Sequence, residues 1–525
     1  MNPAGQTPCD KAAILHGAAS APVAARGQRW TLVAAILGSG MAFIDGSVVN
    51  VALPAIQREL NASAAQLQWV VEAYALFLSS LLLAGGALGD RLGRRRVFMI
   101  GVGLFTVASA ACALSRSADL LIASRALQGV GAALLVPGSL SLIGANFAQA
   151  ERGRAIGTWS AMSGVAAAIG PVAGGWLVEH YRWTWAFFVN LPIGAALLLV
   201  CAYRVPESRN TPDASRIDVP GAALATLGLA GIVFALVQAP LRGWAAVDVL
   251  IALALGIGGL ALFVRTEARS AAPMVPLGLF RIGDFAGANL LTLLLYAALG
   301  GGLYFLPLNL IQVQGYGAAA AGAALLPFIA IMFALSRAAG HIVDRFGPRL
   351  PLIAGPLVAA AGFALFMLPG VGSGYWSGFF PAIVVLGLGM AVTVAPLTTT
   401  VMNAVGSEMA GVASGVNNAV SRAAGLLAVA GFGLLMAWGF EQQLAQSLSG
   451  LHLPAAATDA VLQQRDRLAG IVPPPGLDAA GAAALKQAVG GAFVSGFRQV
   501  MGVCALLALL SGISAAWMIG RRKNP

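Results

Sequence analysis

Long apolar segments separated by short polar connections run along almost the whole chain. Fourteen of them are long enough to cross the hydrocarbon core of a bilayer, about 30 Å, as α-helices. The segments lie at 30–54, 68–88, 97–115, 118–144, 155–178, 184–204, 219–239, 247–265, 285–311, 319–341, 350–370, 378–403, 411–439 and 491–520. This pattern predicts an all-α integral membrane protein.

Polar stretches divide these segments into groups. Residues 205–218 separate the first six from the rest, and residues 266–284 precede the last six. The only long loop, 440–490, lies within the last group, and short surface helices are expected in it. The predicted organisation is a tail at 1–29, a six-helix half at 30–204, a linker with two extra helices at 205–284, a second six-helix half at 285–520 and a tail at 521–525.

A short motif repeats after the second segment of each six-helix half. The first copy, GALGDRLGR at 86–94, contains Gly86, Asp90, Arg91, Gly93 and Arg94. The second copy, GHIVDRFG at 340–347, contains Gly340, Asp344, Arg345 and Gly347. The repeat predicts a bundle of two pseudo-symmetric halves. Bundles built in this way bind ligands near the midplane between the halves and work by alternating access.

Composition agrees with this pattern and excludes a soluble globular protein, because 58% of the 525 residues are hydrophobic and 10% are charged. The net charge of +11 comes from arginines gathered in alternate connections. That distribution is typical of the positive-inside rule, not of a nucleic-acid-binding surface, and it predicts that both termini are cytoplasmic. Residues 1–29 lack the apolar core of a cleavable signal, so the first segment is expected to serve as an uncleaved anchor.

Two opposite charges lie inside predicted spans of the first half. Asp45 occurs within IDGSVVNVALP at 44–54, and Arg125 occurs within LIASRALQGVGAA at 121–133. A charge in the middle of a bilayer is costly unless it is paired, solvated or protonated. We therefore expect Asp45 and Arg125 to be partners. Two interpretations stay open: a proton carrier with its modulating base, and a permanent structural ion pair.

Together these motifs resemble those of the major facilitator superfamily, specifically its fourteen-helix drug:proton antiporters. The resemblance covers nearly the whole chain, with the motifs in the same order. It extends to RWTWAFFVNLPIG at 182–194, and to a glycine-rich signature of drug exporters in the fifth segment, in which Ala166 stands where a further glycine is usual. The residues of that signature are Gly157, Gly170, Pro171, Gly174 and Gly175.

The resemblance implies a function as well as a fold. A protein of this family would export lipophilic, often cationic drugs across the bacterial cytoplasmic (inner) membrane, with the proton gradient in place of a cofactor. Its partners would be small-molecule substrates and membrane lipid, and no nucleic acid. Asp90 would lie at the N-terminus of a helix of the other half, beginning near Gly411, where the helix dipole favours an anion. The glycines of the fifth segment would pack at the seam between the halves.

Glu72 is a second acid inside a predicted span, about one turn into the second segment. It is either a second proton site, or a charge that selects cationic substrates, or a side chain that extends to the outer surface. Further polar and aromatic residues are expected near an apolar substrate cavity between the halves, where cation–π contacts would hold lipophilic cations. These residues are Asn50, Tyr74, Gln128, Tyr296, Tyr304 and Asn417.

Other classes of protein find little support. The three lysines form no phosphate-binding loop, so direct use of ATP is not expected. An intramembrane enzyme would need a nucleophile and base, or metal ligands, clustered in one span, and the sequence shows no such cluster. An exporter dedicated to one metabolite or antibiotic would carry the same motifs as a multidrug exporter. The sequence leaves open whether a periplasmic adaptor docks on the 440–490 loop.

Overall fold

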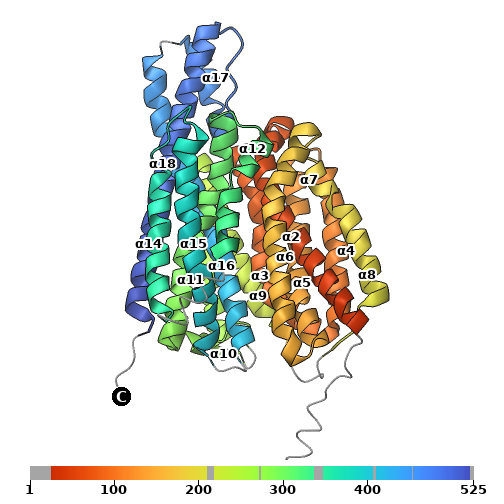
Figure 1. The fold of residues 1–525 in the computed structure, drawn as a ribbon. Coiled ribbons are helices and arrows are strands. Elements are labelled where there is room, and N and C mark those ends of the chain that lie inside the picture. The colour runs from red at the N-terminus through yellow and green to blue at the C-terminus, as the bar shows by residue number, and fades with distance from the viewer. Residues whose placement is uncertain are drawn as a thin grey trace, which may run out of the picture.

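The computed structural model describes residues 25–209, 218–270, 273–335, 347–405, 409–451 and 453–520. Helices are the only regular secondary structure in these ranges, and the long ones stand side by side in a bundle (Figure 1). At one end of the bundle α2 begins at Ala25 and α18 ends at Met518, and we call this end the terminal face. We call the opposite end, where α17 lies, the cap face.

The helices fall into three consecutive groups. The N-half consists of α2 (Ala25–Leu60), α3 (Ala64–Leu92), α4 (Arg94–Ala113), α5 (Ala118–Asn146), α6 (Gln149–His180), α7 (Trp185–Phe188) and α8 (Asn190–Arg204). The pair α9 (Val219–Arg242) and α10 (Val247–Arg269) follows. After the turn η1 (Leu277–Arg281), the described part of the C-half includes α11 (Gly283–Leu308), η2 (Asn309–Val313), α12 (Ala318–Ala323), α14 (Arg349–Leu365), η3 (Tyr375–Phe379), α15 (Phe380–Asn403), α16 (Ala410–Gly450), α17 (Ala455–Leu462), η4 (Arg465–Gly470) and α18 (Ala479–Met518).

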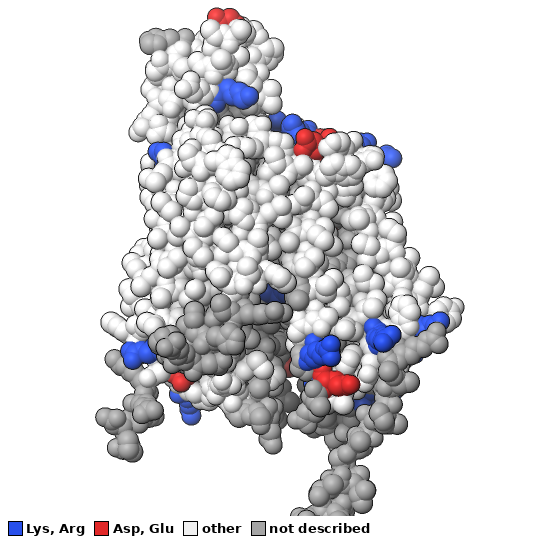
Figure 2. All heavy atoms as spheres, viewed as in Figure 1, with Lys and Arg blue, Asp and Glu red and all other residues white. Residues whose placement is uncertain are grey.

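Thirteen helical segments among the described residues are long and apolar enough to cross a membrane. Where the sequence predicted a span at 350–370, the structure has the shorter apolar helix α14 of 17 residues. This helix ends at Leu365 because Pro369 and Gly370 follow it closely. Figure 2 shows that charged side chains gather toward the two ends of this view, with a broad and almost uncharged belt between them. Such a belt matches the hydrocarbon core of a bilayer.

Glycines let α3 and α5 approach each other closely in the N-half. Gly85 of α3 faces the backbone carbonyl of Ala133, and Gly129 of α5 faces the backbone carbonyl of Tyr74. A Cβ atom at either glycine would overlap the facing oxygen. Small residues commonly allow membrane helices to come this close. The contact holds the polar residues of α5 against α3, beside the site described below.

Two helices of the C-half are much longer than a membrane requires. α16 has 41 residues and α18 has 40. Each is about 60 Å long at about 1.5 Å per residue, twice the thickness of the hydrocarbon core. They extend beyond the rest of the bundle at the cap face, where α17 lies with them (Figure 1). We call residues 440–490, which include α17 and η4, the cap.

The predicted helix ends at 439 and 491 are wrong, because α16 continues to Gly450 and α18 already begins at Ala479. An apolar stripe continues along α16 beyond the predicted end. Phe440, Leu444 and Leu448 recur at four-residue spacing and are all buried. The stretch predicted as a long loop is therefore largely helical, since it has its own apolar contacts outside the uncharged belt.

The close contact of α3 with α5 makes Gly85→Ala a test of the packing. The added Cβ would force the helices apart, and overpacking of this kind costs about 1–3 kcal/mol. Alanine gains only about 0.5–1 kcal/mol over glycine within a helix, so the variant should be less stable. We expect a lower unfolding temperature in detergent, measured by differential scanning fluorimetry. In the control Gly103→Ala no described atom lies within 4 Å of the new Cβ, so its unfolding temperature should be unchanged or higher. Equal behaviour of the two variants would contradict the contact.

Candidate functional site

Asp45 and Arg125 form an ion pair inside the N-half. Asp45 lies in the middle of α2 and Arg125 lies in α5. The Arg125 Nη1 atom donates to Asp45 Oδ2 over 2.5 Å, and the Arg125 and Asp45 side chains are 1% and 0% exposed. The structure thus brings together the two charges that the sequence placed in separate spans, and it removes both from solvent.

Neutral polar side chains complete the surroundings of the Asp45 carboxylate. Gln128 Nε2 donates to Asp45 Oδ1 over 2.7 Å, and Asn190 Nδ2 donates to the same oxygen over 3.1 Å. Ser109 Oγ accepts from both amides, at 2.8 Å and 3.3 Å. The carboxylate therefore has three side-chain donors, from α5 and α8. Gln128 was predicted near a substrate cavity, but it belongs to this cluster, and sequence reasoning assigned no role to Asn190 or Ser109.

Arg125 is held from several sides as well. Its Nε donates to the backbone carbonyl of Val70 over 3.0 Å, and its Nη1 also donates to Gln128 Oε1 over 2.6 Å. The guanidinium lies 4.3 Å from the centre of the Tyr74 ring and 5.8 Å from that of Phe187. Such cation–π contacts are strongest where water is excluded. Tyr74, predicted near the substrate cavity, is buried in contact with this pair.

The hydrogen bonds of the sealed cluster offset the cost of burying its two charges. Removing two charges from water costs several kcal/mol, which is recovered only with good geometry and additional hydrogen bonds. Those conditions are met here, so the charged pair is stable in this conformation. The Asp45 carboxylate is 0% exposed, so it has no contact with solvent in this conformation.

Glu72 of α3 is buried in a different way. It is 1% exposed, and neither carboxylate oxygen has a hydrogen-bond partner among the residues that the structure describes. The expectation that Glu72 could extend to the outer surface is therefore wrong, because α3 packs this position against the C-half. Tyr304 of α11 lies close enough to interact with it electrostatically. A buried acid without a partner is costly, which makes Glu72 a candidate functional group.

The glycine-rich signature of α6 contacts its own half as well as the C-half, so the expected packing at the seam applies to only part of it. Gly170 and Gly174 face Ser47 and Val48 of α2. Gly175 faces the backbone carbonyl of Ala318, at the start of α12 in the C-half, and a Cβ atom at any of these three glycines would overlap its neighbour.

The contact between α6 and α12 is mutual, since Gly322 of α12 faces the backbone carbonyl of Pro171. Gly157 has no described atom within 4 Å of its Cβ position, so in this conformation it does not share the role of the other signature glycines.

The loop motif after α3 makes contacts within the N-half. Arg94 Nε donates to Asp90 Oδ1 over 2.8 Å. Gly93 has a φ of +112°, which favours glycine. The carboxylate of Glu207, to which the sequence gave no role, accepts from the backbone N–H groups of Arg95 (3.0 Å) and Arg96 (3.1 Å) at the start of α4. An anion is stabilised at this position by the helix dipole.

The remaining described residues of the two loop motifs have different surroundings. Arg91 is exposed, and the Cβ position of Gly86 makes ordinary contact with Pro137. In the second copy, Gly347 has a φ of +72°. Gly340, Asp344 and Arg345 lie outside the described residues.

The predicted cavity residues of the two halves have different surroundings. In the C-half, Asn417 Nδ2 donates to Thr292 Oγ1 over 2.7 Å and to Asn289 Oδ1 over 3.1 Å. Tyr304 is buried, and it lines a pocket at the cap face. Asn50 Oδ1 is buried without a partner among the described residues, and Tyr296 is half-buried. These residues lie on both halves, as a route between the halves would require.

Comparison with known proteins places this architecture in a family. The model of the Major Facilitator Superfamily matches residues 35–429. The tetracenomycin C resistance and export protein of Streptomyces glaucescens is 34% identical over 95% of this chain and 93% of its own length. Multidrug resistance protein Stp of Mycobacterium tuberculosis is 37% identical over 85% of this chain and 82% of its own, and puromycin resistance protein of Streptomyces alboniger is 36% identical over 76% and 80%. The chain belongs to the Major Facilitator Superfamily.

Solved structures agree at the level of fold. A bacterial homologue of the human lysosomal transporter Spinster, in an inward-facing and unoccupied conformation, matches with a TM-score of 0.63 over 94% of this chain and 98% of its own, at 17% identity. A peptide transporter in complex with sulfate matches with a TM-score of 0.58 over 92% and 95%, at 16% identity. The predicted family is thus confirmed, and the chain is a multi-pass membrane transporter rather than an enzyme.

The sealed ion pair predicts how the removal of one or both of its charges changes the unfolding temperature. Asp45→Asn leaves Arg125 buried without a counter-charge, and breaking a buried pair on one side costs about 3–5 kcal/mol. We expect a large fall in unfolding temperature in detergent. The double variant Asp45→Asn/Arg125→Gln removes both charges and should be clearly more stable than the single variant. Glu59→Gln is the control, because it breaks the exposed pair of Glu59 with Arg182 (2.8 Å) and should change little. A single variant as stable as the wild type would mean that Arg125 gains solvent or another partner.

Proposed function

We propose that this chain is a proton-driven exporter of lipophilic, often cationic compounds, working by alternating access in the bacterial cytoplasmic (inner) membrane. The observation that carries the proposal is the Asp45–Arg125 pair, a charged cluster sealed inside one half of a transporter. The relatives support the choice of substrate, because their names describe resistance to and export of antibiotics and drugs. The proton gradient supplies the energy, and the partners are small-molecule substrates and membrane lipid.

The proposed topology has fourteen spans arranged as six, two and six. In it α14 is a short span, and α9 and α10 form the extra pair between the halves. The terminal face is cytoplasmic, since the arginine-rich connections of the sequence alternate with connections of low charge. The cap then faces the periplasm. A periplasmic adaptor docked on the cap is a further partner for which this topology leaves room.

The contacts between the halves support an inward-facing state. The hydrogen bonds between the halves that join described residues all lie toward the cap face. To release a substrate there, the halves must break these bonds and separate. The bonds join Gln57 to Gln312 (2.7 Å), Gln57 to the carbonyl of Arg467 (3.1 Å), Gln68 to the carbonyl of Val429 (3.1 Å) and Glu179 to the N–H of Ala319 (3.0 Å).

In this mechanism Asp45 carries the proton and Arg125 controls when it binds. While the cluster is sealed, three donors stabilise the carboxylate in its charged form. Opening toward the periplasm would move α2 relative to α5 and weaken the ion pair. A carboxylate that loses its counter-charge in hydrocarbon takes up a proton. On the return to the inward-facing state Arg125 approaches Asp45 again, and the proton leaves toward the cytoplasm before the cluster is sealed.

Asp90 has a role in the outward-facing state, in which the terminal face is closed. In this conformation its carboxylate is occupied by Arg94. When the terminal face closes, the N-terminus of α16 would approach the end of α3, and Asp90 would meet the positive end of that helix. An anion there contributes about 0.3–1 kcal/mol when exposed and up to about 2 kcal/mol when partly buried. That is enough to change the balance between two states that are close in energy.

The direct test is Asp45→Asn in transport. We expect proton-driven accumulation of ethidium by everted membrane vesicles to fall to the background of vesicles without the transporter. The amount of protein in the membrane should be compared by immunoblot. Asp119→Asn, which changes an exposed acid at the cap face, should transport as the wild type does. Energised transport at the wild-type rate in Asp45→Asn would remove Asp45 from the proposed mechanism.

The buried carboxylate of Glu72 predicts that the rate of transport depends on the charge of the substrate. If its carboxylate attracts cations into the route between the halves, Glu72→Gln should weaken transport of monovalent cationic dyes severalfold, while neutral drugs are transported at nearly the normal rate. The measurement is initial efflux rate for a cationic and a neutral substrate in the same cells. Equal loss for both classes would indicate a folding or proton-coupling defect instead of a selective charge.

A dedicated exporter of one antibiotic or metabolite is the second candidate, because the tetracenomycin C relative is named for a single compound. Competition in everted vesicles separates the two. If several unrelated cations and dyes inhibit one another's uptake, the route is shared and export is polyspecific. If only one chemical family competes, the protein is a dedicated exporter.

A further inference from the structure

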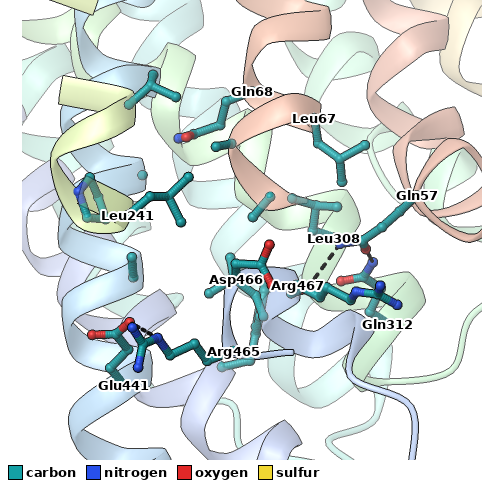
Figure 3. A pocket seen from close by; sticks show the side chains of 18 of the residues that line it. Gln57, Leu67, Gln68, Leu241, Leu308, Gln312, Glu441, Arg465, Asp466 and Arg467 are labelled. Carbon is teal, nitrogen blue, oxygen red and sulfur yellow. Dashed lines mark hydrogen bonds and ion pairs between the residues drawn. The ribbon is translucent and has the colours of Figure 1, made fainter. Parts of the chain in front are cut away.

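A pocket of about 570 Å³ lies at the cap face, where the cap meets both halves and α9. Figure 3 shows its inner walls, with Leu67 from α3, Leu308 from α11 and Leu241 from α9 around an open centre. The volume is within the range of pockets that hold small organic molecules. Gln57, Gln68 and Gln312, which bond the two halves together, are part of its lining, but the proposed mechanism places no ligand in it.

One acid of the cap lies in this apolar setting without a partner. Asp466 of η4 is half-buried, and its side chain extends into the pocket between the leucine walls (Figure 3). No described residue donates a hydrogen bond to its carboxylate or forms an ion pair with it. The neighbouring base Arg465 is occupied by Glu441, at 3.4 Å, and points away from the centre. Asp466 is thus free to bind a ligand.

The other charges of the pocket lie at its edges. Asp459 is exposed on α17. The Arg467 side chain extends toward Gln312, at the opposite end of the pocket from the Glu441–Arg465 pair (Figure 3). With Glu441 and Arg465 paired, the lining carries one more negative than positive charge. A ligand between the leucine walls would therefore meet the carboxylate of Asp466 first.

The backbone beside Asp466 is strained and anchored to the N-half. Leu468 has a φ of 52°, a left-handed conformation that is rare for leucine. The carbonyl of Arg467 accepts from Gln57 of α2 over 3.1 Å. Strain of this kind persists only where the surroundings enforce it, and it commonly occurs at ligand sites. Here it keeps the Asp466 segment directed into the pocket.

The pocket exists only while the halves are together on this side. Its walls come from α2 and α3 of the N-half and from α11, α16 and the cap of the C-half. Separation of the halves would pull these walls apart. A ligand that binds one conformation better than another shifts the population toward it.

We propose that the cap pocket is a binding site for amphiphilic organic cations that arrive from the cap face, and that its occupation holds the cap face closed. The carboxylate of Asp466 binds the cationic centre and the leucine walls bind the apolar groups. The effect on conformation rests on the proposed alternating access, but the binding does not.

Tetraphenylphosphonium and tetraphenylborate are matched probes, because they share one shape and carry opposite charges. With the full chain in lipid nanodiscs, isothermal titration should detect a tetraphenylphosphonium site that Asp466→Asn weakens by about tenfold or more, as loss of one close opposite charge requires. Asp466→Glu keeps the charge, and Asp119→Asn removes an acid of the same face outside the pocket. Both should bind within about twofold of the wild type. Tetraphenylborate should lack this site.

Unchanged binding by Asp466→Asn, or tetraphenylborate binding as tightly as the cation, would overturn the proposal. Misfolding is a minor concern for Asp466→Asn because the substitution breaks no hydrogen bond between described residues, and its unfolding temperature should match the wild type. If Asp45→Asn transports normally while the Asp466 result holds, the proposed function fails and the cap site stands.

The conformational part has its own measurement. Spin labels at Arg116 of the N-half and Trp376 of the C-half, both exposed near the cap face, report the distance between the halves there. Tetraphenylphosphonium should increase the short-distance population in the wild type and leave it unchanged in Asp466→Asn. A longer distance on binding in the wild type would contradict the closed-state preference.

Discussion

The cost of a charge in hydrocarbon is the constraint on which the N-half depends. Asp45 and Arg125 cannot reach water from the middle of their helices, so the surrounding helices must supply the hydrogen bonds that water would make. Ser109 of α4 and Asn190 of α8 turn their polar groups inward, and α3 offers the carbonyl of Val70. One ion pair thereby determines how five helices face one another.

Close backbone contact is the second physical element, and it lies at a different place. The halves meet through Gly175 of α6 and Gly322 of α12, each against a backbone carbonyl of the other half. Without side chains at these positions the contact consists of backbone surfaces, with no ion pair to break when the halves move. The cap adds polar contacts that can exchange with water, such as Gln57 with Gln312 (2.7 Å).

Sequence reasoning identified the charged pair because an intramembrane charge needs a partner, and only one arginine lay in a neighbouring span of the same half. It placed Gln128 in a substrate cavity and gave Asn190 and Ser109 no role. Neutral polar residues are common in membrane helices, and nothing in their spacing shows that they converge on one carboxylate. That the Glu72 carboxylate has no hydrogen-bond partner among the described residues could not be predicted either, since it depends on which side chains of the C-half lie beside α3.

The cap shows another limit of reading a sequence by hydropathy. The predicted spans ended at 439 and began again at 491 because uniform apolarity ends there. Beyond those points α16 is amphipathic, and the stripe of Phe440, Leu444 and Leu448 is visible only at helical spacing. The family was recognised from its motifs, which lie in the helices of the two halves and not in the cap. A pocket formed by the cap and both halves could not be predicted from either part alone.

The Asp45–Arg125 pair and the seam between the halves are linked through one helix. Ser47 and Val48 follow Asp45 within a single turn of α2, and they rest against Gly170 and Gly174. Gly175, the next residue of α6, rests against the C-half at Ala318. A movement of α2 that separates Asp45 from Arg125 must therefore displace α6, because the facing glycines have no side chain that could yield. Since α6 bears directly on α12, such a movement of α2 would also disturb the contact between the halves.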